Sequence, residues 1–269
     1  MHNTIQKAGK VLHLFSLNRL GLELSAAEMA RQLGEPTSTM HDLLHSMVAI
    51  GLLEVTRKNR YRLGWELVRL SHLRYFYTQC NTEVHACLHQ LSKETSLSAH
   101  YSLLENDTWI VLEFVVGSQM VVSATNSFPI DAPMFWTVGG QVLWAHQPWE
   151  HVEQVIAKHG FGSNLPNSVS LSQSYRQELE RVRQEGFAER IDGEERSIAA
   201  PVFHYPQHTQ NTQSQQAVIG AITLFGPTPV FGIEPLQLRD RLIQASQQLS
   251  DQLRKMDDPY ATLYPTKPT

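Results

Sequence analysis

The chain contains 269 residues, of which 42% are hydrophobic and 18% charged, with a net charge of −4. This composition excludes a disordered or low-complexity protein and leaves room for two globular domains. It also excludes a helical membrane protein, because no unbroken apolar run reaches the ~18 residues that a membrane-spanning helix requires.

The charge is distributed unevenly along the chain. Residues 1–80 contain ten Lys or Arg and six Asp or Glu, so this segment is basic whereas the remainder is acidic. Such an asymmetry favours a nucleic-acid-binding module joined to a second domain of different function. The only cysteines, Cys80 and Cys87, form neither a disulfide framework nor a zinc motif. We therefore expect reduced thiols, no metal and no cofactor in a cytoplasmic protein, since no apolar signal-peptide segment follows the first residues.

Two amphipathic helices are predicted before residue 34. Residues 5–17 place apolar side chains at positions i, i+3, i+4 and i+7, the spacing of one helix face. Ser25 and Glu28 then form a capping-box pattern, in which the serine caps the first amides of a helix and the glutamate bonds back to the cap. The helix that follows, 26–33, repeats the apolar spacing, so both helices have a face to bury.

A third helix follows after a tight turn. Gly34 suits the left-handed position that ends a helix, and Pro36 suits the first turn of the next one. This next helix extends to Gly51 and carries one apolar stripe. Two amphipathic helices joined by so short a turn must cross steeply to share a core, which predicts a helix-turn-helix.

A basic hairpin is predicted directly after these helices. Residues 53–56 and 61–63 alternate inward and outward side chains as strands do, and residues 57–60 (Arg-Lys-Asn-Arg) join them. Asn59 accommodates the positive φ of such a turn at low cost. A helix-turn-helix followed by a basic hairpin predicts a winged DNA-binding domain.

The remaining chain alternates helices and strands. Residues 65–78 predict a linker helix whose apolar side chains include Trp65 and Leu73, and a helix at 83–93 follows it. The wholly polar segment 207–216 predicts a mobile loop. Further strands are predicted at 97–104, 109–116, 119–125, 187–191, 198–203 and 217–224, and further helices at 138–146, 149–159, 173–185 and 234–254.

The outward side of the third helix carries the candidate DNA-reading residues. Short hydroxyl side chains at its N-terminus suit phosphate contacts, whereas His41 and His45, one turn apart, can reach base edges in the major groove. The basic hairpin suits phosphate contacts or the minor groove. The predicted DNA-binding residues are Ser25, Thr37, Ser38, Thr39, His41, Asp42, His45, Arg57, Lys58, Asn59, Arg60 and Arg62.

Seven segments of the chain resemble the IclR (isocitrate lyase regulator) family of bacterial transcription regulators. They are Ala8–Phe15, Leu24–Gly34, Pro36–Leu44, Tyr61–Gly64, Pro133–Ala145, Arg181–Ala188 and Ile198–Val202. Each segment is moderately specific by itself, and their order and spacing together are a strong signal. The resemblance covers nearly the whole chain. Thr37 and Asp42 depart from the family, which commonly has basic residues at these positions. The resemblance implies a regulator, not an enzyme, that binds a near-palindromic double-stranded DNA operator as a homodimer or homotetramer and responds to a small organic acid or aromatic catabolite.

The resemblance also implies a fold class and an effector site. The expected class is α+β: a winged helix-turn-helix, a linker helix, and a GAF-like α/β effector-binding domain with an antiparallel sheet. Trp136 and Trp144 are expected to place bulk near the helix that borders the effector. The implied effector contacts are Ala132, Val138 and Gly139 at the start of this helix, and Asp192, Ser197 and Thr223 on the sheet.

The domain boundaries follow from the same elements. The DNA-binding domain is expected at 1–64, a linker and dimerisation helix at 65–80, and the effector-binding domain at 81–256. The proline-containing tail, 257–269, is expected to be disordered.

Two other functions fit parts of the sequence. The second domain would serve only for oligomerisation if its interior were filled. A metal-dependent enzyme is the weaker alternative, since His85 and His89 have a spacing that zinc can use. No third ligand lies nearby in the sequence, and no G-x-S-x-G, P-loop or H-E-x-x-H motif occurs, which favours surface histidines instead.

Overall fold

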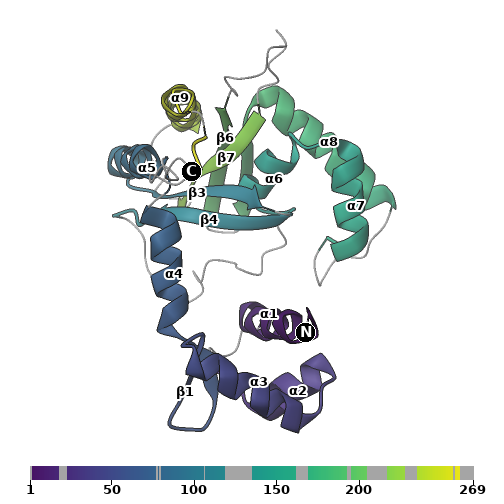
Figure 1. The fold of residues 1–269 in the computed structure, drawn as a ribbon. Helices are drawn as coiled ribbons and strands as arrows, with labels where there is room; N and C mark the ends of the chain where they lie inside the picture. Colours follow the sequence, from purple (N-terminus) through teal and green to yellow (C-terminus); the bar gives the residue numbers. More distant parts are fainter. Residues whose placement is uncertain are drawn as a thin grey trace, which may run out of the picture. The chain divides into compact units, whose positions relative to one another are not determined.

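The computed structural model describes residues 2–17, 23–76, 78, 80–105, 107–118, 135–161, 169–192, 195–204, 217–227, 235–256 and 258–260. Tertiary contacts divide the chain into two units, residues 1–76 and 77–269 (Figure 1). The linker helix belongs to the first unit by its contacts, so the division falls four residues before the expected limit at residue 80.

The first unit contains four helices and a hairpin among the described residues. A single apolar core joins α1, α2, α3 and the hairpin, with Val11, Met29 and Leu44 almost fully buried in it. In chain order the elements are α1 (His2–Leu17), α2 (Ala26–Leu33), α3 (Thr37–Ala49), β1 (Leu53–Val55), β2 (Tyr61–Leu63) and α4 (Trp65–Phe76).

The turn between α2 and α3 forms as the sequence predicts. Ser25 Oγ accepts a hydrogen bond from the Glu28 amide at 3.2 Å, while Glu28 Oε2 accepts one from the Ser25 amide at 2.7 Å. At the other end of α2, Gly34 has a φ of +66°. Lys7 Nζ lies 2.8 Å from Glu35 Oε2 and thereby ties α1 to this turn. These contacts confirm the capped helix, the tight turn and the second helix of the motif.

The hairpin is tied to the helices by a backbone bridge. β1 and β2 pair antiparallel, and Asn59 in their turn has a φ of +55°. Leu24, just before α2, donates its amide to Tyr61 O at 2.9 Å, and Tyr61 donates to Leu24 O at 2.7 Å. The hairpin is therefore a wing fixed to the base of the helix-turn-helix.

The second unit is built on an antiparallel sheet. The described strands lie in the order β4-β3-β7-β6-β5, with antiparallel pairing throughout. The elements are α5 (Asn81–Thr95), β3 (Ser98–Glu105), β4 (Thr108–Val115), α6 (Val138–Trp144), α7 (Trp149–His159), α8 (Val169–Glu185), β5 (Ala188–Asp192), β6 (Glu195–His204), β7 (Ala217–Pro227) and α9 (Pro235–Leu253).

Helices cover both faces of this sheet. α5 and α9 pack on one face, and α6 packs on the other with α7 and α8 outside it (Figure 1). Successive strand residues alternate between the two cores, so that Tyr101 and Ile222 face α5 and α9, whereas Ala199 and Ala221 face α6. This arrangement confirms the α+β class. The predicted strand 119–125 and the polar loop 207–216 lie outside the described residues.

Residues 258–260, the last ones described, make contacts that the expected disordered tail would not make. Pro259 is buried, and its carbonyl accepts a hydrogen bond from the Cys80 amide at 2.9 Å. The hydroxyls of Tyr260 and Tyr101 lie 2.9 Å apart, and Tyr260 also donates to the Ile219 carbonyl. The expected disorder therefore does not hold for residues 258–260, because their apolar and hydroxyl groups find partners on the sheet.

Candidate functional site

The exposed face of α3 forms a polar surface on the first unit. The helix buries Met40, Leu43, Leu44 and Met47 against the core. Pro36 occupies the N-cap and makes no side-chain cap bond, so no side chain caps the first amides of α3. The exposed side chains include those of Thr37, Ser38, Thr39, His41, Asp42 and His45, as the sequence predicts for this side of the helix.

The four basic residues of the wing have different environments. Arg57 and Lys58 are exposed at the tip beside Asn59 and have no ion pair among the described residues. Arg60 instead places Nη2 2.8 Å from Glu28 Oε2 and donates to Glu23 O at 2.9 Å. The wing tip therefore presents Arg57 and Lys58 to solvent, while Arg60 fastens the wing to the start of α2.

Two other predicted DNA-binding residues are also engaged within the unit. Arg62 donates from Nε and Nη2 to Glu54 Oε2, at 3.0 and 2.8 Å, on the neighbouring strand. The Ser25 hydroxyl is part of the capping box and donates a hydrogen bond to Glu28 Oε2 at 2.9 Å. Both residues thus position the motif, and their side chains are less available to a ligand than those on α3.

Three buried polar atoms of the second unit converge on one glycine. An added Cβ at Gly139 would lie 3.0 Å from Thr223 Oγ1, 3.1 Å from Ser102 Oγ and 3.6 Å from Trp109 Nε1. None of these three atoms has a hydrogen-bond partner among the described residues, and all three are buried. Buried polar groups are normally paired, so this cluster is a candidate binding site.

Aromatic side chains continue the site along the same face of the sheet. His100 and Trp109 meet edge to face, with ring centroids 5.6 Å apart. Phe225 lies 5.7 Å from the His100 ring and 5.8 Å from the stacked ring of Phe114. Burial lowers the pKa of His100 to about 3, so this imidazole is neutral at physiological pH.

The structure brings together only part of the predicted effector set. Gly139 and Thr223 lie at the cluster, and Val138 directly precedes Gly139 at the start of α6, whereas Ser197 is half-buried on β6 opposite Phe225. Ala132 and the side chain of Asp192 lie outside the described residues.

The sequence predictions missed Ser102, Trp109 and His100. The signal for β3 was present, because Ser98, His100 and Ser102 form a polar stripe at a spacing of two within an otherwise apolar strand. A predicted strand alone does not show which residues of other strands lie beside such a stripe.

The two tryptophans near α6 do not contribute to the cluster. Trp144 is buried in the core outside the sheet, 5.4 Å from the Phe135 ring. Trp136 Nε1 donates to the Phe161 carbonyl at 2.9 Å. Neither ring is among the atoms nearest Gly139, so the expected bulk lies elsewhere.

His85 and His89 on α5 lie side by side. The His85 and His89 rings lie 4.2 Å apart, and His85 Nδ1 is 3.4 Å from Glu113 Oε1. Within the described ranges, no group of three or more His, Cys, Asp or Glu residues is arranged to hold a metal. No described helix is long and apolar enough to cross a membrane.

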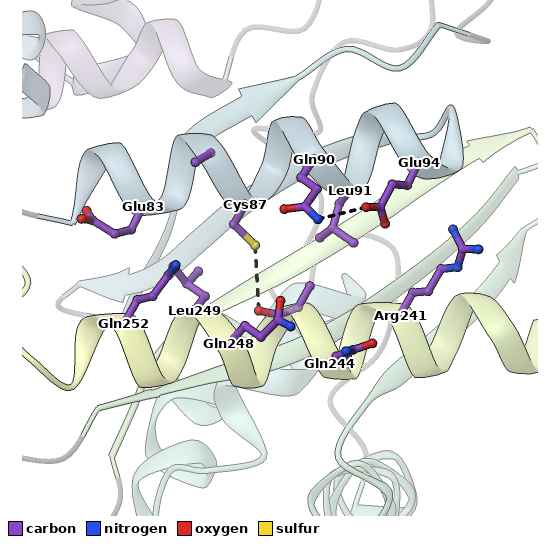
Figure 2. Close-up of a pocket in the computed structure, with 12 residues that line it drawn as sticks. Glu83, Cys87, Gln90, Leu91, Glu94, Arg241, Gln244, Gln248, Leu249 and Gln252 are labelled. Carbon is purple, nitrogen blue, oxygen red and sulfur yellow. Dashed lines mark hydrogen bonds between the residues drawn. The ribbon is translucent and has the colours of Figure 1, made fainter.

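A groove of about 280 Å³ runs between α5 and α9 (Figure 2). Its sides carry mainly glutamine and glutamate, and at its floor Cys87 Sγ donates to the Ala245 carbonyl at 3.9 Å. Burial raises the pKa of the Cys87 thiol to about 11, so this thiol is unreactive at neutral pH. The groove lies on the face of the sheet opposite the Gly139 cluster.

Both units match families of known proteins. Residues 4–57 match the IclR helix-turn-helix domain, and residues 78–251 match the bacterial transcriptional regulator IclR C-terminal domain. The HTH-type transcriptional regulator XynR of Escherichia coli K12 is 24% identical over 254 residues, 92% of this chain and 95% of XynR. KdgR of Dickeya chrysanthemi, also an HTH-type transcriptional regulator, is 22% identical over 243 residues, 88% of this chain and 76% of KdgR.

Solved structures share the fold. A putative IclR transcriptional regulator from Silicibacter sp. TM1040 superposes with a TM-score of 0.73 at 25% identity, covering 98% of this chain and 100% of that one. An IclR homolog from Microbacterium hydrocarbonoxydans, complexed with 4-hydroxybenzoate, gives a TM-score of 0.66 at 20% identity, covering 94% and 99%. The winged helix-turn-helix, the helix-covered antiparallel sheet and the two domain matches together show that this chain belongs to the IclR family of bacterial transcriptional regulators.

Proposed function

We propose that this chain binds a near-palindromic operator in double-stranded DNA through its first unit, and that a small molecule bound by its second unit changes the affinity for that operator. One observation carries the DNA-binding part: an exposed polar face of α3 lies in the same unit as a wing whose Arg57 and Lys58 are free of ion pairs among the described residues. The site of action is then the cytoplasm, where operator DNA lies.

The residue roles follow from exposure and chemistry. His41 and His45 are one turn apart on α3 and are placed to read base edges in the major groove. The hydroxyls of Thr37, Ser38 and Thr39 suit phosphates at the uncapped start of the helix. Arg57, Lys58 and Asn59 contact the backbone or minor groove from the wing. Asp42 is exposed on the same side of α3 and disfavours an adjacent phosphate, which makes it a specificity determinant.

We assign the dimer contact to the linker helix and the base of the wing. Trp65 is 73% exposed, and Val68, Leu70 and Leu73 on α4 are also exposed. Exposing several large apolar side chains to water on one helix is unfavourable, which indicates an interaction surface. A groove of about 570 Å³ beside Trp65 is lined by Val48, Leu53 and Val55. A second copy covering these apolar groups places two α3 helices on successive half-sites, and dimers of this kind associate further into tetramers.

The Gly139 cluster is the proposed effector site. Its buried hydroxyls, those of Ser102 and Thr223, have no hydrogen-bond partner among the described residues, which favours a ligand over a role in oligomerisation alone. A small organic acid or an aromatic catabolite fits these groups, and the IclR homolog from Microbacterium hydrocarbonoxydans was solved with 4-hydroxybenzoate bound. An enzymatic role has no support from the relatives, which are transcription regulators.

Selection from a random duplex library tests the DNA-binding role. Intact protein is expected to enrich a near-palindromic motif with half-sites about one helical turn apart, as a dimer requires. His41→Ala and His45→Ala should relax the preference at one or two base positions in each half-site while leaving affinity for random duplex nearly unchanged. Equal losses on selected and random DNA would contradict base reading by these histidines.

A further inference from the structure

The exposed side of α5 carries two histidines one helical turn apart. The side chain of His85 is 55% exposed, and His89 is exposed as well. Their ring centroids lie 4.2 Å apart, with the ring planes inclined by 56°. Histidines at i and i+4 on one helix face can bind a single zinc ion through both imidazoles. This pair belongs neither to the proposed DNA-binding surface nor to the Gly139 cluster.

A carboxylate from the sheet lies beside this pair, although no third ligand is near it in the sequence. Glu113 on β4 is paired with Tyr101 on β3, and Tyr101 belongs to the core between the sheet and α5. Directly paired strand residues share one face, so Glu113 is on the side of the sheet that α5 covers. Its Oε1 lies 3.4 Å from His85 Nδ1. The fold therefore adds a group that the sequence spacing does not reveal.

The negative charge of Glu113 is poorly compensated by its surroundings. The side chain is 12% exposed, and the ion pair with His85 is the only one that it forms within the described part of the chain. Burial raises the pKa of this carboxyl, because the charged form loses solvation. A divalent cation held by His85 would bring positive charge toward Glu113 and stabilise its ionised form.

The contact with Glu113 determines which nitrogen of His85 is available to a metal. An ionised carboxylate only accepts hydrogen bonds, so the Nδ1 that faces it carries the proton and Nε2 keeps its lone pair. Carboxylates orient metal-binding histidines in this way and raise their basicity. Zinc bonds of about 2.0–2.1 Å place two imidazole nitrogens roughly 3.3 Å apart, which small rotations of these neighbouring rings can reach. No third protein ligand is arranged at the pair in the described ranges, so water completes the coordination.

We propose that His85 Nε2 and a ring nitrogen of His89 bind a zinc ion on α5, and that Glu113 is a positioning residue that orients His85. The ligand is a borderline divalent cation, since imidazole suits zinc whereas magnesium and calcium prefer oxygen ligands. The proposal is independent of the DNA-binding and effector roles, because it uses none of their residues. It gives the second unit a metal ligand that the proposed function does not require.

Zinc titration of the intact, metal-free protein by calorimetry tests the site. One zinc ion per chain is expected to depend on this pair, and magnesium should not bind there. His85→Gln and His89→Gln should each weaken zinc binding at least about tenfold, because each removes one of the two protein ligands. Both side chains are exposed, so these variants should keep the fold, which circular dichroism checks. The matched control is His159→Gln at the exposed end of α7, which should leave zinc affinity unchanged.

Glu113→Gln tests the positioning role. The substitution keeps the shape of the side chain but removes its negative charge, so it should weaken zinc binding to the folded protein about 10–100-fold. A purely structural role would instead lower the unfolding temperature of the metal-free protein and leave zinc affinity unchanged. That result would overturn the assignment of Glu113.

A second histidine pair of the same spacing provides the competing site. His41 and His45 lie on α3, and the double variant His41→Gln with His45→Gln should keep the zinc binding that we assign to α5. Loss of zinc binding in that double variant would overturn the proposal. So would zinc binding that survives in His85→Gln with His89→Gln, or the absence of saturable zinc binding by the wild type.

Discussion

At the scale of single residues, environment separates side chains that look equivalent in the sequence. The wing carries four basic residues, but two of them face carboxylates of the same unit: Arg60 pairs with Glu28, and Arg62 pairs with Glu54. Ion pairs this accessible to solvent contribute little stability, yet they occupy the two guanidinium groups. Under the proposed function, we therefore expect Arg57 and Lys58 to make most of the DNA contacts of the wing.

Buried histidine makes the stability of the second unit depend on pH. Burial lowers the pKa of His100 from 6.5 to about 3. Between these values the unfolded chain holds a proton that the folded chain does not, so the free energy of unfolding should fall as pH decreases below 6.5. The loss should be about 1.4 kcal/mol per pH unit.

His100→Gln tests this dependence, because glutamine is neutral throughout. Urea unfolding of the variant between pH 7 and pH 4.5, on the order of two pH units, should show a shallower loss of stability than the wild type. A residual slope of the same sign is expected from His146, whose pKa is also lowered by burial. Identical slopes for variant and wild type would contradict the assignment to His100.

At the scale of elements, the described chain end is part of the second domain. Pro259 and Tyr260 connect the residue before α5 to β3 and β7, through the Cys80 amide, the Tyr101 hydroxyl and the Ile219 carbonyl. Tyr101 lies between His100 and Ser102 in β3 and faces the opposite side of the sheet. Residues 259 and 260 therefore support the strand that carries two residues of the proposed effector site.

Tyr260→Phe should lower the free energy of unfolding of the second unit by about 1–3 kcal/mol, because the buried Tyr101 hydroxyl loses its partner. Thermal and urea unfolding of the intact protein would measure this loss. The double variant Tyr101→Phe with Tyr260→Phe removes both hydroxyls, so it should recover part of the stability. A single variant as stable as the wild type would show that the hydroxyl pair contributes nothing.

Elements with strong local signals could be predicted from the sequence. Apolar spacing, the Ser25–Glu28 box and Gly34 are short-range features, and they located α2, its cap and the turn before α3. The expected helix at 173–185 begins earlier, at Val169, because residues 169–172 (Val-Ser-Leu-Ser) alternate apolar and polar side chains and show no helical spacing.

The Gly139 cluster could be predicted only in part because it depends on long-range register. Ser102, Trp109 and Thr223 become neighbours through pairing of β3 with β4 and β7, and no local pattern encodes that register. Likewise, the partners of Arg60 lie on and just before α2, a contact that the hairpin pattern does not reveal.

At the scale of the whole molecule, the proposed function divides DNA recognition and regulation between the two units. The first unit carries the side chains that we propose read DNA, and the second encloses polar groups that lack partners in the described chain. An effector changes operator affinity only if it binds two arrangements of the dimer differently, and couplings between sites of this kind are typically about 1–3 kcal/mol. The linker helix α4 ends at Phe76, the last residue of the first unit, so the chain enters the second unit directly after this helix.

The most direct test of DNA recognition is the salt dependence of binding to a random-sequence duplex, measured by fluorescence anisotropy with the intact protein. Wild type should bind in dilute buffer and weaken steeply as salt increases. Arg57→Ala with Lys58→Ala should weaken binding and flatten the slope, by about two released counterions per protomer. Lys93→Ala with Lys158→Ala removes the same charge from exposed positions of the second unit and should change neither. Failure of the wild type to bind duplex even at low salt, or equal effects of the two double variants, would contradict the account.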